Sequence, residues 1–219
     1  KKGLMQKLLT GEVRLPGFKG EWKEVKLSKI CTLETGKRPK GGVTTKGEIP
    51  SLGGENIYSD NGLNLTTIKK VNLEFYESMT KGQLKENDIL INKDGAQTGK
   101  VALYKDSGLE KACINEHLFI VRTTKNISYK FLYYYLGSEE GQQKMKVRIT
   151  SSAQPGLNSQ FVKGFTLRIP VYEEQKLIGD ILFSLDKELL LLKDEKMLLE
   201  KQKKGLMQLL LTGKVRVKV

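Results

Sequence analysis

The sequence predicts a mixed α/β (α+β) globular domain followed by a long coiled-coil α-helix. Up to Tyr172, short apolar runs alternate with glycine- and proline-containing turns, which is typical of a globule built from short strands and helices. From Glu173 to about Leu211 the chain has no proline and only two glycines. Apolar residues recur there at every seventh position, as in a helix that packs on another helix. These residues are Ile178, Leu185, Leu192, Leu199 and Leu206.

Short apolar runs bounded by turn residues predict the strands of the globule. The runs cover residues 88–92, 100–104, 112–114 and 118–122. A further strand is expected where Phe165, Leu167 and Ile169 alternate with polar residues, and Pro170 ends it. The sheet should therefore form from the middle and the end of the globular part.

Helices are predicted between these strands. Ser128 can cap a helix that ends at Gly137, and a second helix is expected over residues 139–148. The apolar spacing within Glu24–Leu33 predicts another helix. The stretch Gly36–Asn64 holds seven glycines and two prolines, so we expect it to be rich in loops.

The heptad pattern of the last segment also has a second row, at the d positions, which contains leucines. Lys196 and Lys203 interrupt this second row. At about 1.5 Å per residue, the helix would run about 57 Å, so we expect it to reach beyond its own globule. The alternative is a long helix lying on the surface of the globule. The expected helix-pairing residues are Ile178, Leu182, Leu185, Leu189, Leu192, Leu199, Leu206 and Leu210. The continuous leucines 189–192 suggest that this part is buried all round.

An internal repeat marks both ends of the chain. Lys1–Arg14 reads KKGLMQKLLTGEVR and Lys203–Arg216 reads KKGLMQLLLTGKVR, with 12 of 14 positions identical. We therefore divide the chain into residues 1–14, which carry the first copy of the repeat; residues 15–172, a globular domain; and residues 173–219, a long pairing helix that carries the second copy. The repeat fits two tandem copies of one large unit, and it also fits a single unit whose copies assemble.

Charge points to a polyanion partner. The chain carries a formal charge of +13, and residues 1–172 hold 28 basic against 17 acidic side chains, which leaves +11 on the globular part. Such an excess on one unit is typical of nucleic-acid binding. No apolar run is long enough to cross a membrane. Lys1–Arg14 does not resemble a signal peptide, and the two cysteines form no paired motif. We expect a reduced, cytoplasmic protein.

The motifs of common enzymes are absent from this sequence. Gly95–Lys100 reads GAQTGK, with three residues between its glycines and valine after the lysine, so it is not a P-loop. No Pro-Pro pair supplies an amino-methyltransferase motif. His117, the single histidine, is expected to be structural, and Asp88 and Asp94 are interpreted as turn residues. We predict no catalytic and no metal-binding residue.

Three polar loops, together with Asn56 and Tyr58, hold the expected nucleic-acid contacts. Glycine-rich loops let backbone amides approach phosphates, Lys and Arg neutralise them, and Arg, Lys, Gln and Asn read base edges. The candidates are Lys37, Arg38, Lys40, Lys46, Asn56, Tyr58, Lys93, Gln97, Thr98, Lys100, Arg148, Ser151, Ser152, Gln154 and Asn158. Which of them contact bases and which contact phosphates is left open.

Short motifs, taken in order, resemble the specificity subunits of type I restriction-modification systems. Trp22 opens the recognition domain as in that family, and Gly36, Arg38 and Pro39 follow. The further matches are Ile49-Pro50, Glu55-Asn56-Ile57, Asn87-Asp88-Ile89-Leu90 (with Asn87 where glycine is usual), Asp94-Gly95, Gly99-Lys100, Ile169-Pro170 with Glu174-Gln175 and Ile178, and the tail 205–216.

The resemblance implies a non-catalytic subunit that reads one half of a split double-stranded DNA site. In that family's terms, residues 1–14 would be the tail of a conserved helical region, residues 15–172 the DNA target-recognition domain, and residues 173–219 the conserved helix for dimerisation, spacing and methyltransferase binding. It also implies that methyltransferase subunits grip an antiparallel pair of conserved helices, that a motor-nuclease subunit can join, and that S-adenosylmethionine, ATP and Mg bind those partners. The second helix would come from another half-subunit, from a second copy, or from the rest of a longer chain. Two alternatives stay open: a DNA-processing enzyme such as a nuclease, and a coiled-coil assembly protein that does not contact DNA.

Overall fold

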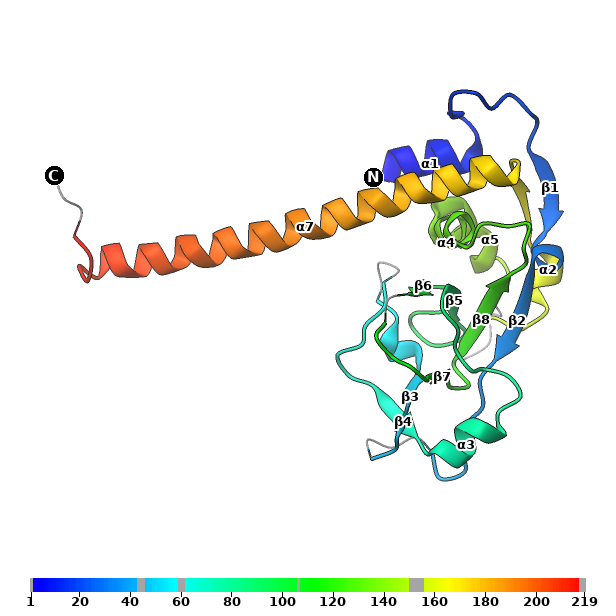
Figure 1. Cartoon of the computed structure of the whole chain (residues 1–219), viewed down its shortest axis with the longest axis horizontal. Coiled ribbons are helices and arrows are strands. Elements are labelled where there is room, and N and C mark those ends of the chain that lie inside the picture. The colour runs from blue at the N-terminus through cyan, green and yellow to red at the C-terminus, as the bar shows by residue number, and fades with distance from the viewer. Residues whose placement is uncertain (1, 43–45, 59–61, 106, 150–155, 217–219) are drawn as a thin grey trace.

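The computed structural model shows a globule from which one long helix projects (Figure 1). The structure describes residues 2–42, 46–58, 62–105, 107–149 and 156–216. The projecting helix, α7 (Tyr172–Leu211), is 40 residues long, so the predicted long helix and the mixed α/β class are both confirmed. No helix in the described part of the chain is long and apolar enough to cross a membrane.

A four-stranded antiparallel sheet forms the centre of the globule. Its order is β2 (Cys31–Thr35), β8 (Leu118–Thr123), β5 (Asp88–Asn92) and β6 (Val101–Tyr104). Side chains alternate across β5, so Ile89 and Ile91 face one core while Leu90 faces another. The strand is buried along its whole length because both faces of the sheet are covered.

A smaller sheet covers one face of the central sheet. It has the order β4 (Lys69–Val71), β3 (Ile49–Leu52) and β7 (Cys113–Ile114). Along the chain, the short helix η1 (Gly54–Asn56) follows β3, and α3 (Leu73–Ser78) follows β4. Strand β3 lies inside the stretch that we expected to be loop. The sequence pattern did not reveal this strand, because only four residues pair and glycine-rich segments flank them.

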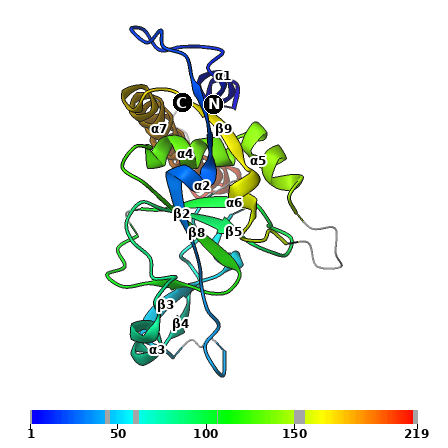
Figure 2. The same cartoon turned by 90° about the vertical axis from the view of Figure 1, so that its right-hand side faces the viewer.

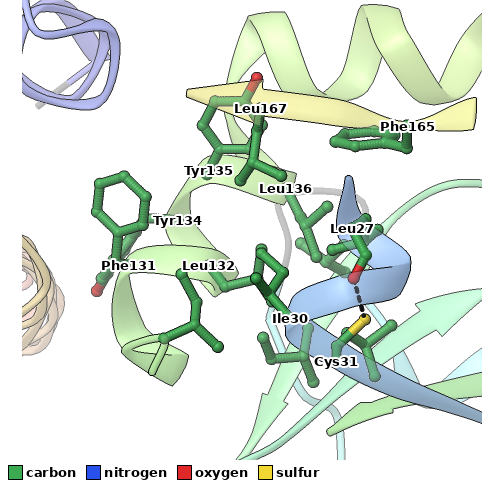
Figure 3. Packing of buried hydrophobic residues seen from close by; sticks show 14 of the residues in the cluster. Leu27, Ile30, Cys31, Phe131, Leu132, Tyr134, Tyr135, Leu136, Phe165 and Leu167 are labelled. Atoms are coloured by element: carbon green, nitrogen blue, oxygen red, sulfur yellow. Dashed lines mark hydrogen bonds between the residues drawn. The ribbon is translucent and has the colours of Figure 1, made fainter. Parts of the chain in front are cut away.

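The other face of the central sheet packs against helices. α4 (Tyr129–Gly137) and α5 (Glu139–Lys146) lie where the sequence predicts them. The Ser128 side chain accepts a hydrogen bond from the amide of Phe131, as an N-cap should. Figure 3 shows the aromatic and aliphatic side chains of α4 meeting Leu27 and Ile30.

The chain enters and leaves the globule through one pair of strands. β1 (Lys23–Lys26) runs antiparallel to β9 (Thr166–Ile169), with Val25 opposite Leu167. The helix predicted over Glu24–Leu33 is therefore wrong: only α2 (Leu27–Ile30) is helical, and strands flank it. A second short helix, α6 (Phe161–Gly164), precedes β9.

The backbone at Asn87 has a conformation that glycine adopts more easily than other residues. Its φ is +71°, the only positive φ at a non-glycine residue in the described part of the chain. Asparagine tolerates this conformation better than most side chains. Asn87 can therefore stand where the resembling family usually has glycine, in the turn that leads into β5.

Helix α1 (Lys2–Thr10) lies along the first turns of α7 and runs in the opposite direction (Figure 1). Ile178 and Leu182 of α7 are fully buried within their own globule, on the side where α4 and α7 meet. The prediction that these two residues pair with a second long helix is therefore wrong. Beyond the partly buried Leu185, the row is exposed: Leu189, Leu192, Leu199, Leu206 and Leu210 are 38–59% accessible. The leucines 189–192 are likewise exposed rather than buried all round.

Candidate nucleic-acid interface

Three loops meet at the edge of the central sheet that faces away from α7 (Figures 1 and 2). Strand register explains this, because Thr35 pairs with Phe119, and Asn92 pairs with Leu118. The residues after β2, after β5 and before β8 must therefore emerge together. The predicted candidates on the first two of these loops come from segments far apart in sequence but lie at one edge.

Backbone hydrogen bonds join the loops. The Lys93 amide donates to the carbonyl of His117 at 2.8 Å, and the Leu157 amide donates to the carbonyl of Lys93 at 2.7 Å. Asp94 also forms an isolated bridge with Gly156. The segment 93–99 is thus fixed between residues 115–117 and residues 156–158, and its side chains are presented from a rigid base.

The turn after β5 is built around two glycines. Gly95 and Gly99 have φ of +78° and +84°, and the Thr98 hydroxyl donates to the carbonyl of Gly95 at 2.6 Å. Gln97 and Lys100, which flank Thr98, are partly exposed. The Lys93 ammonium bonds weakly to the carbonyl of Glu116 at 3.4 Å. This turn therefore presents polar side chains at the edge, as predicted.

The segment after β2 supplies most of the exposed positive charge. Lys37, Arg38, Lys40 and Lys46 are all exposed. Gly36 anchors the segment, since a Cβ there would lie 2.1 Å from the carbonyl oxygen of Ile114. Arg38 approaches the Glu116 carboxylate at 3.6 Å, which joins this segment to the turn before β8.

His117 lies at the meeting point, together with two acidic residues that sequence reasoning did not select for the interface. Its Nδ1 is 2.8 Å from the carboxylate of Asp94, and its Nε2 is 3.6 Å from that of Glu116. About half of the His117 side chain is accessible. In the described residues no group of three or more His, Cys, Asp or Glu could hold a metal ion. In the sequence, the only feature that pointed to this cluster was the lone histidine just before a predicted strand.

Two of the predicted contacts are structural instead. Asn56 is 1% exposed; its side-chain oxygen Oδ1 accepts from the amide of Gly53, and its side-chain NH2 group donates to the carbonyls of Asn64 and Thr67. Arg148 donates to the carbonyls of Lys144 and Gly164 and lies over the Phe165 ring. We therefore remove Asn56 and Arg148 from the candidate interface, because the polar groups of both side chains are bonded to backbone atoms of the globule.

The remaining candidates divide by position. Tyr58 is 47% exposed. Asn158 is exposed, and its side chain accepts from the amide of Gln160 at 2.9 Å. Ser151, Ser152 and Gln154 lie outside the described residues. The interface is thus carried by the segments 36–40, 93–100 and 115–117, with Asn158 beside them.

At the end of β5 and β8 that lies opposite these loops, a partly buried ion network joins three strands. Arg122 of β8 binds Asp88 of β5 through two hydrogen bonds of 2.7 Å and binds Glu34 of β2 at 2.6 Å. Hydrogen bonding to Asp88, assisted by the charges of both carboxylates, raises the pKa of Arg122 above its usual value. Asp88 thus forms an ion pair and is also a turn residue, as predicted, because its carboxylate accepts from the amide of Lys85 at 2.8 Å.

The chain combines a small α/β globule, which has a polar, basic loop edge at one end, with a long, partly uncovered helix at the other end. This arrangement defines the chain as a globular module joined to a projecting helix. Residues 19–201 match the family described as the type I restriction modification DNA specificity domain. The chain belongs to this family of DNA specificity domains.

Known relatives agree with this assignment. The chain is 29% identical over 232 residues to the type I restriction enzyme MjaVIII specificity subunit of Methanocaldococcus jannaschii, covering 100% of this chain and 54% of the relative. The chain thus spans about half the length of the curated relative that it matches.

Solved structures share the fold at low sequence identity. A chain from a study of complex assembly in the type I R-M system aligns with a TM-score of 0.66 and 21% identity, over 94% of this chain and 49% of that one. The HsdS subunit of Thermoanaerobacter tengcongensis gives 0.58 and 20%, over 88% and 44%. The specificity subunit of M. genitalium gives 0.60 and 17%, over 94% and 51%.

Proposed function

We propose that the chain reads one half of a bipartite double-stranded DNA site and directs the methyltransferase and motor-nuclease subunits of a type I complex to it. The carrying observation is the convergence of segments 36–40, 93–100 and 115–117 at one edge of the sheet. S-adenosylmethionine, ATP and Mg would bind those partners, and this chain supplies sequence recognition. The nuclease alternative finds no supporting cluster in the described residues.

The two ends of the globule would then have different tasks. Lys37, Arg38 and Lys40 are placed to neutralise phosphates, while Gln97 and Lys93 stand on the anchored turn where a base edge could be read. α7 leaves from the opposite end (Figure 1), so partners bound to this helix would not cover the loop edge. The helix would connect this reader to a second one through an antiparallel pair.

Titration of duplex DNA against the complex reconstituted with methyltransferase subunits tests the proposal. The triple variant Lys37→Ala, Arg38→Ala, Lys40→Ala should weaken binding at least tenfold. A charge-matched control is Lys26→Ala, Lys29→Ala, Lys125→Ala, because these exposed residues lie near the opposite end of the sheet. Equal losses in both triple variants would show that only net charge matters and would contradict the interface.

A further inference from the structure

The turn 93–99, which follows β5, has a backbone that depends on support from its surroundings. Its two glycines, Gly95 and Gly99, both have positive φ, and glycine moves between backbone conformations more freely than any other residue. Backbone hydrogen bonds at Lys93 hold the beginning of the turn. At its end, the Gly99 amide donates to the carbonyl of Asn92 at 2.8 Å. This bond closes the hairpin between β5 and β6 but does not tie the turn to the helices.

One side chain of α5 joins the Gly99 end of the turn to α4. The side-chain NH2 group of Gln142 donates to the carbonyl of Gly99 at 2.9 Å and to the carbonyl of Leu136 at 2.8 Å. Leu136 lies in the last turn of α4 and is fully buried. An NH2 group has two N–H donors, which is the number that these two carbonyls require. Gln142 therefore bridges the turn and α4.

The packing of α5 on α4 fixes the position of Gln142. Gly141 lies so close to α4 that a Cβ there would be 2.1 Å from the carbonyl oxygen of Tyr135. The Tyr135 hydroxyl donates to the Glu140 carboxylate at 2.8 Å and accepts from the Lys144 ammonium at 2.9 Å. Lys144 and Glu140 also bind each other at 2.7 Å. These contacts lie on both sides of Gln142 in the sequence and hold its backbone against α4.

α4 lies between α7 and the central sheet and is attached to the first part of α7 (Figure 1). Gly179 of α7 allows a close approach, because a Cβ there would come within 2.7 Å of the Lys130 side chain. Polar contacts spread from position 175 to position 186 span about 16 Å of α7 at about 1.5 Å per residue, and such a length resists rotation of one helix on the other. The contacts join Ser128 to Gln175, Lys130 to Asp180, and Tyr134 to Asp186.

We propose that Gln142 is a positioning residue for DNA reading, which carries the fixed orientation of α4 and α7 to the turn 93–99 through the carbonyl of Gly99. The inference rests on the proposed function, in which Lys93 and Gln97 of this turn reach base edges. Such side chains must be held within about 0.5 Å of the productive geometry. Without the two bonds of Gln142 the turn would tilt, and Lys93 and Gln97 would accept incorrect bases more readily.

Two substitutions of Gln142 separate hydrogen bonding from the filling of space. Gln142→Met keeps the length of the side chain but has no donor. Gln142→Glu keeps the shape but directs a carboxylate, which has no N–H donor, at two carbonyl oxygens. If Gln142 only filled space, both variants would behave like the unchanged protein. Gln143→Met is the matched control, because Gln143 is the next residue of α5 and is exposed.

Hydrogen–deuterium exchange of the full chain without DNA tests the support of the turn. Peptides covering residues 93–100 should exchange several-fold faster in Gln142→Met and Gln142→Glu, and at the unchanged rate in Gln143→Met. A peptide covering residues 118–123 of β8 should keep its rate in all three variants. Equal exchange of the turn in the Gln142 and Gln143 variants would overturn the proposal. Faster exchange in β8 as well would show general loosening of the globule and would also overturn it.

Methylation of a random-sequence duplex library by the complex reconstituted with methyltransferase subunits tests the effect on reading. Sequencing of the methylated duplexes gives the preference for each base at each position. The positions that depend on the turn are those at which the double variant Lys93→Ala, Gln97→Ala loses preference. At these positions Gln142→Met should lower the preference by about fivefold or more, the lower end of the discrimination that one base contact gives. The salt dependence of binding should not change, because no charge is removed.

Combining the substitutions shows whether Gln142 acts through the turn. In the Lys93→Ala, Gln97→Ala background, Gln142→Met should reduce the preference no further, because the side chains that it positions are gone. A further loss there would contradict the proposal.

The same data separate failure of this inference from failure of the proposed function. If the turn variant loses base preference and Gln142→Met does not, the positioning role is wrong and the proposed function stands. If neither loses preference, the turn does not read bases, and both are wrong.

Discussion

Arg122 and Asp88 form a two-pronged ion pair at the end of β8 and β5 that lies opposite the loop edge. Nε and Nη2 of Arg122 each donate to one carboxylate oxygen of Asp88 at 2.7 Å, and Asp88 is 1% exposed. Planar guanidinium and carboxylate groups fit together in this way, which adds geometric specificity to the charge interaction. Glu34 is held by the same arginine and in turn accepts from the amide of Gly82. The pair therefore ties β5 to β8, and Glu34 of β2 joins them through the same arginine.

Arg122→Met should lower the free energy of unfolding by about 3 kcal/mol, because it leaves two carboxylates without their cation. Urea unfolding followed by circular dichroism measures this. Arg38→Ala, at an exposed arginine, is the control and should change stability by less than about 0.5 kcal/mol. A loss at Arg122 no larger than the loss at Arg38 would contradict a structural role for the network.

Cys31 should be unreactive in the folded protein and should make stability fall in alkali. Burial raises the pKa of its thiol from 9.0 to about 12. Since the folded pKa is above the unfolded one, the contribution is complete below pH 9 and is lost as the pH rises from 9 to 12. Unfolding measured between pH 8 and 11 should decline less steeply in Cys31→Ala. Identical slopes of stability against pH for the unchanged protein and for Cys31→Ala would show that the Cys31 thiol does not cause the decline.

The loop edge should give DNA binding a measurable dependence on salt. Neutralising three phosphates contributes about 2.7 to the slope of log affinity against log salt. Removing the charges of Lys37, Arg38 and Lys40 should therefore reduce the slope by two to three, at about 0.9 per contact. Titrations at several salt concentrations give the slope. An unchanged slope would place the phosphate contacts elsewhere on the chain.

The structure predicts that α7 changes role along its length. Leu182 is fully buried against its own globule, whereas Leu199 is 56% exposed. Leu182→Ala should cost about 2–5 kcal/mol of stability, while Leu199→Ala should cost less than about 0.5 kcal/mol when measured at low protein concentration. In a concentrated sample or an assembled complex, Leu199→Asp should instead impair pairing. Equal effects of the two alanine substitutions would contradict this division.

α7 should also act as a ruler between two readers. Deleting the heptad Lys193–Leu199 keeps the apolar row in phase and shortens the helix by about 10 Å at about 1.5 Å per residue. That equals about three base pairs at about 3.4 Å each. The reconstituted complex should either lose activity or methylate sites with a shorter spacer and unchanged half-sites. Methylation at the original spacing would show that α7 does not set the distance.

The sequence predicted best the elements whose signals are local. The strands at 88–92 and 118–122 are buried apolar runs, and the Ser128 cap is a contact between neighbours in sequence. The helix expected over Glu24–Leu33 failed because apolar spacing there also fits a strand. Val25 pairs with Leu167, 142 residues further on, and no local pattern reveals such a partner.

The candidate interface was predicted in outline but not in every residue. Polar loops with glycines signalled the exposed lysines, because those residues stay at the surface whatever packs below. Asn56 and Arg148 are polar residues of the same kinds, but their side chains are bonded to the backbone of the globule. Asp94, Glu116 and His117 come together only through the sheet register, which a sequence without its fold does not display.

The pairing of β1 with β9 brings the incoming and outgoing chains of the globule together. Lys23 lies opposite Ile169 and Lys26 lies opposite Thr166, so the two chains stand side by side next to the helices α1 and α7. α4, which lies between these strands in sequence, also packs against α7, through a hydrogen bond from the amide of Ser128 to Gln175 and an ion pair between Lys130 and Asp180. A segment with another DNA specificity could therefore be grafted at β1 and β9 only if it keeps α4 and the contacts of α4 with α7.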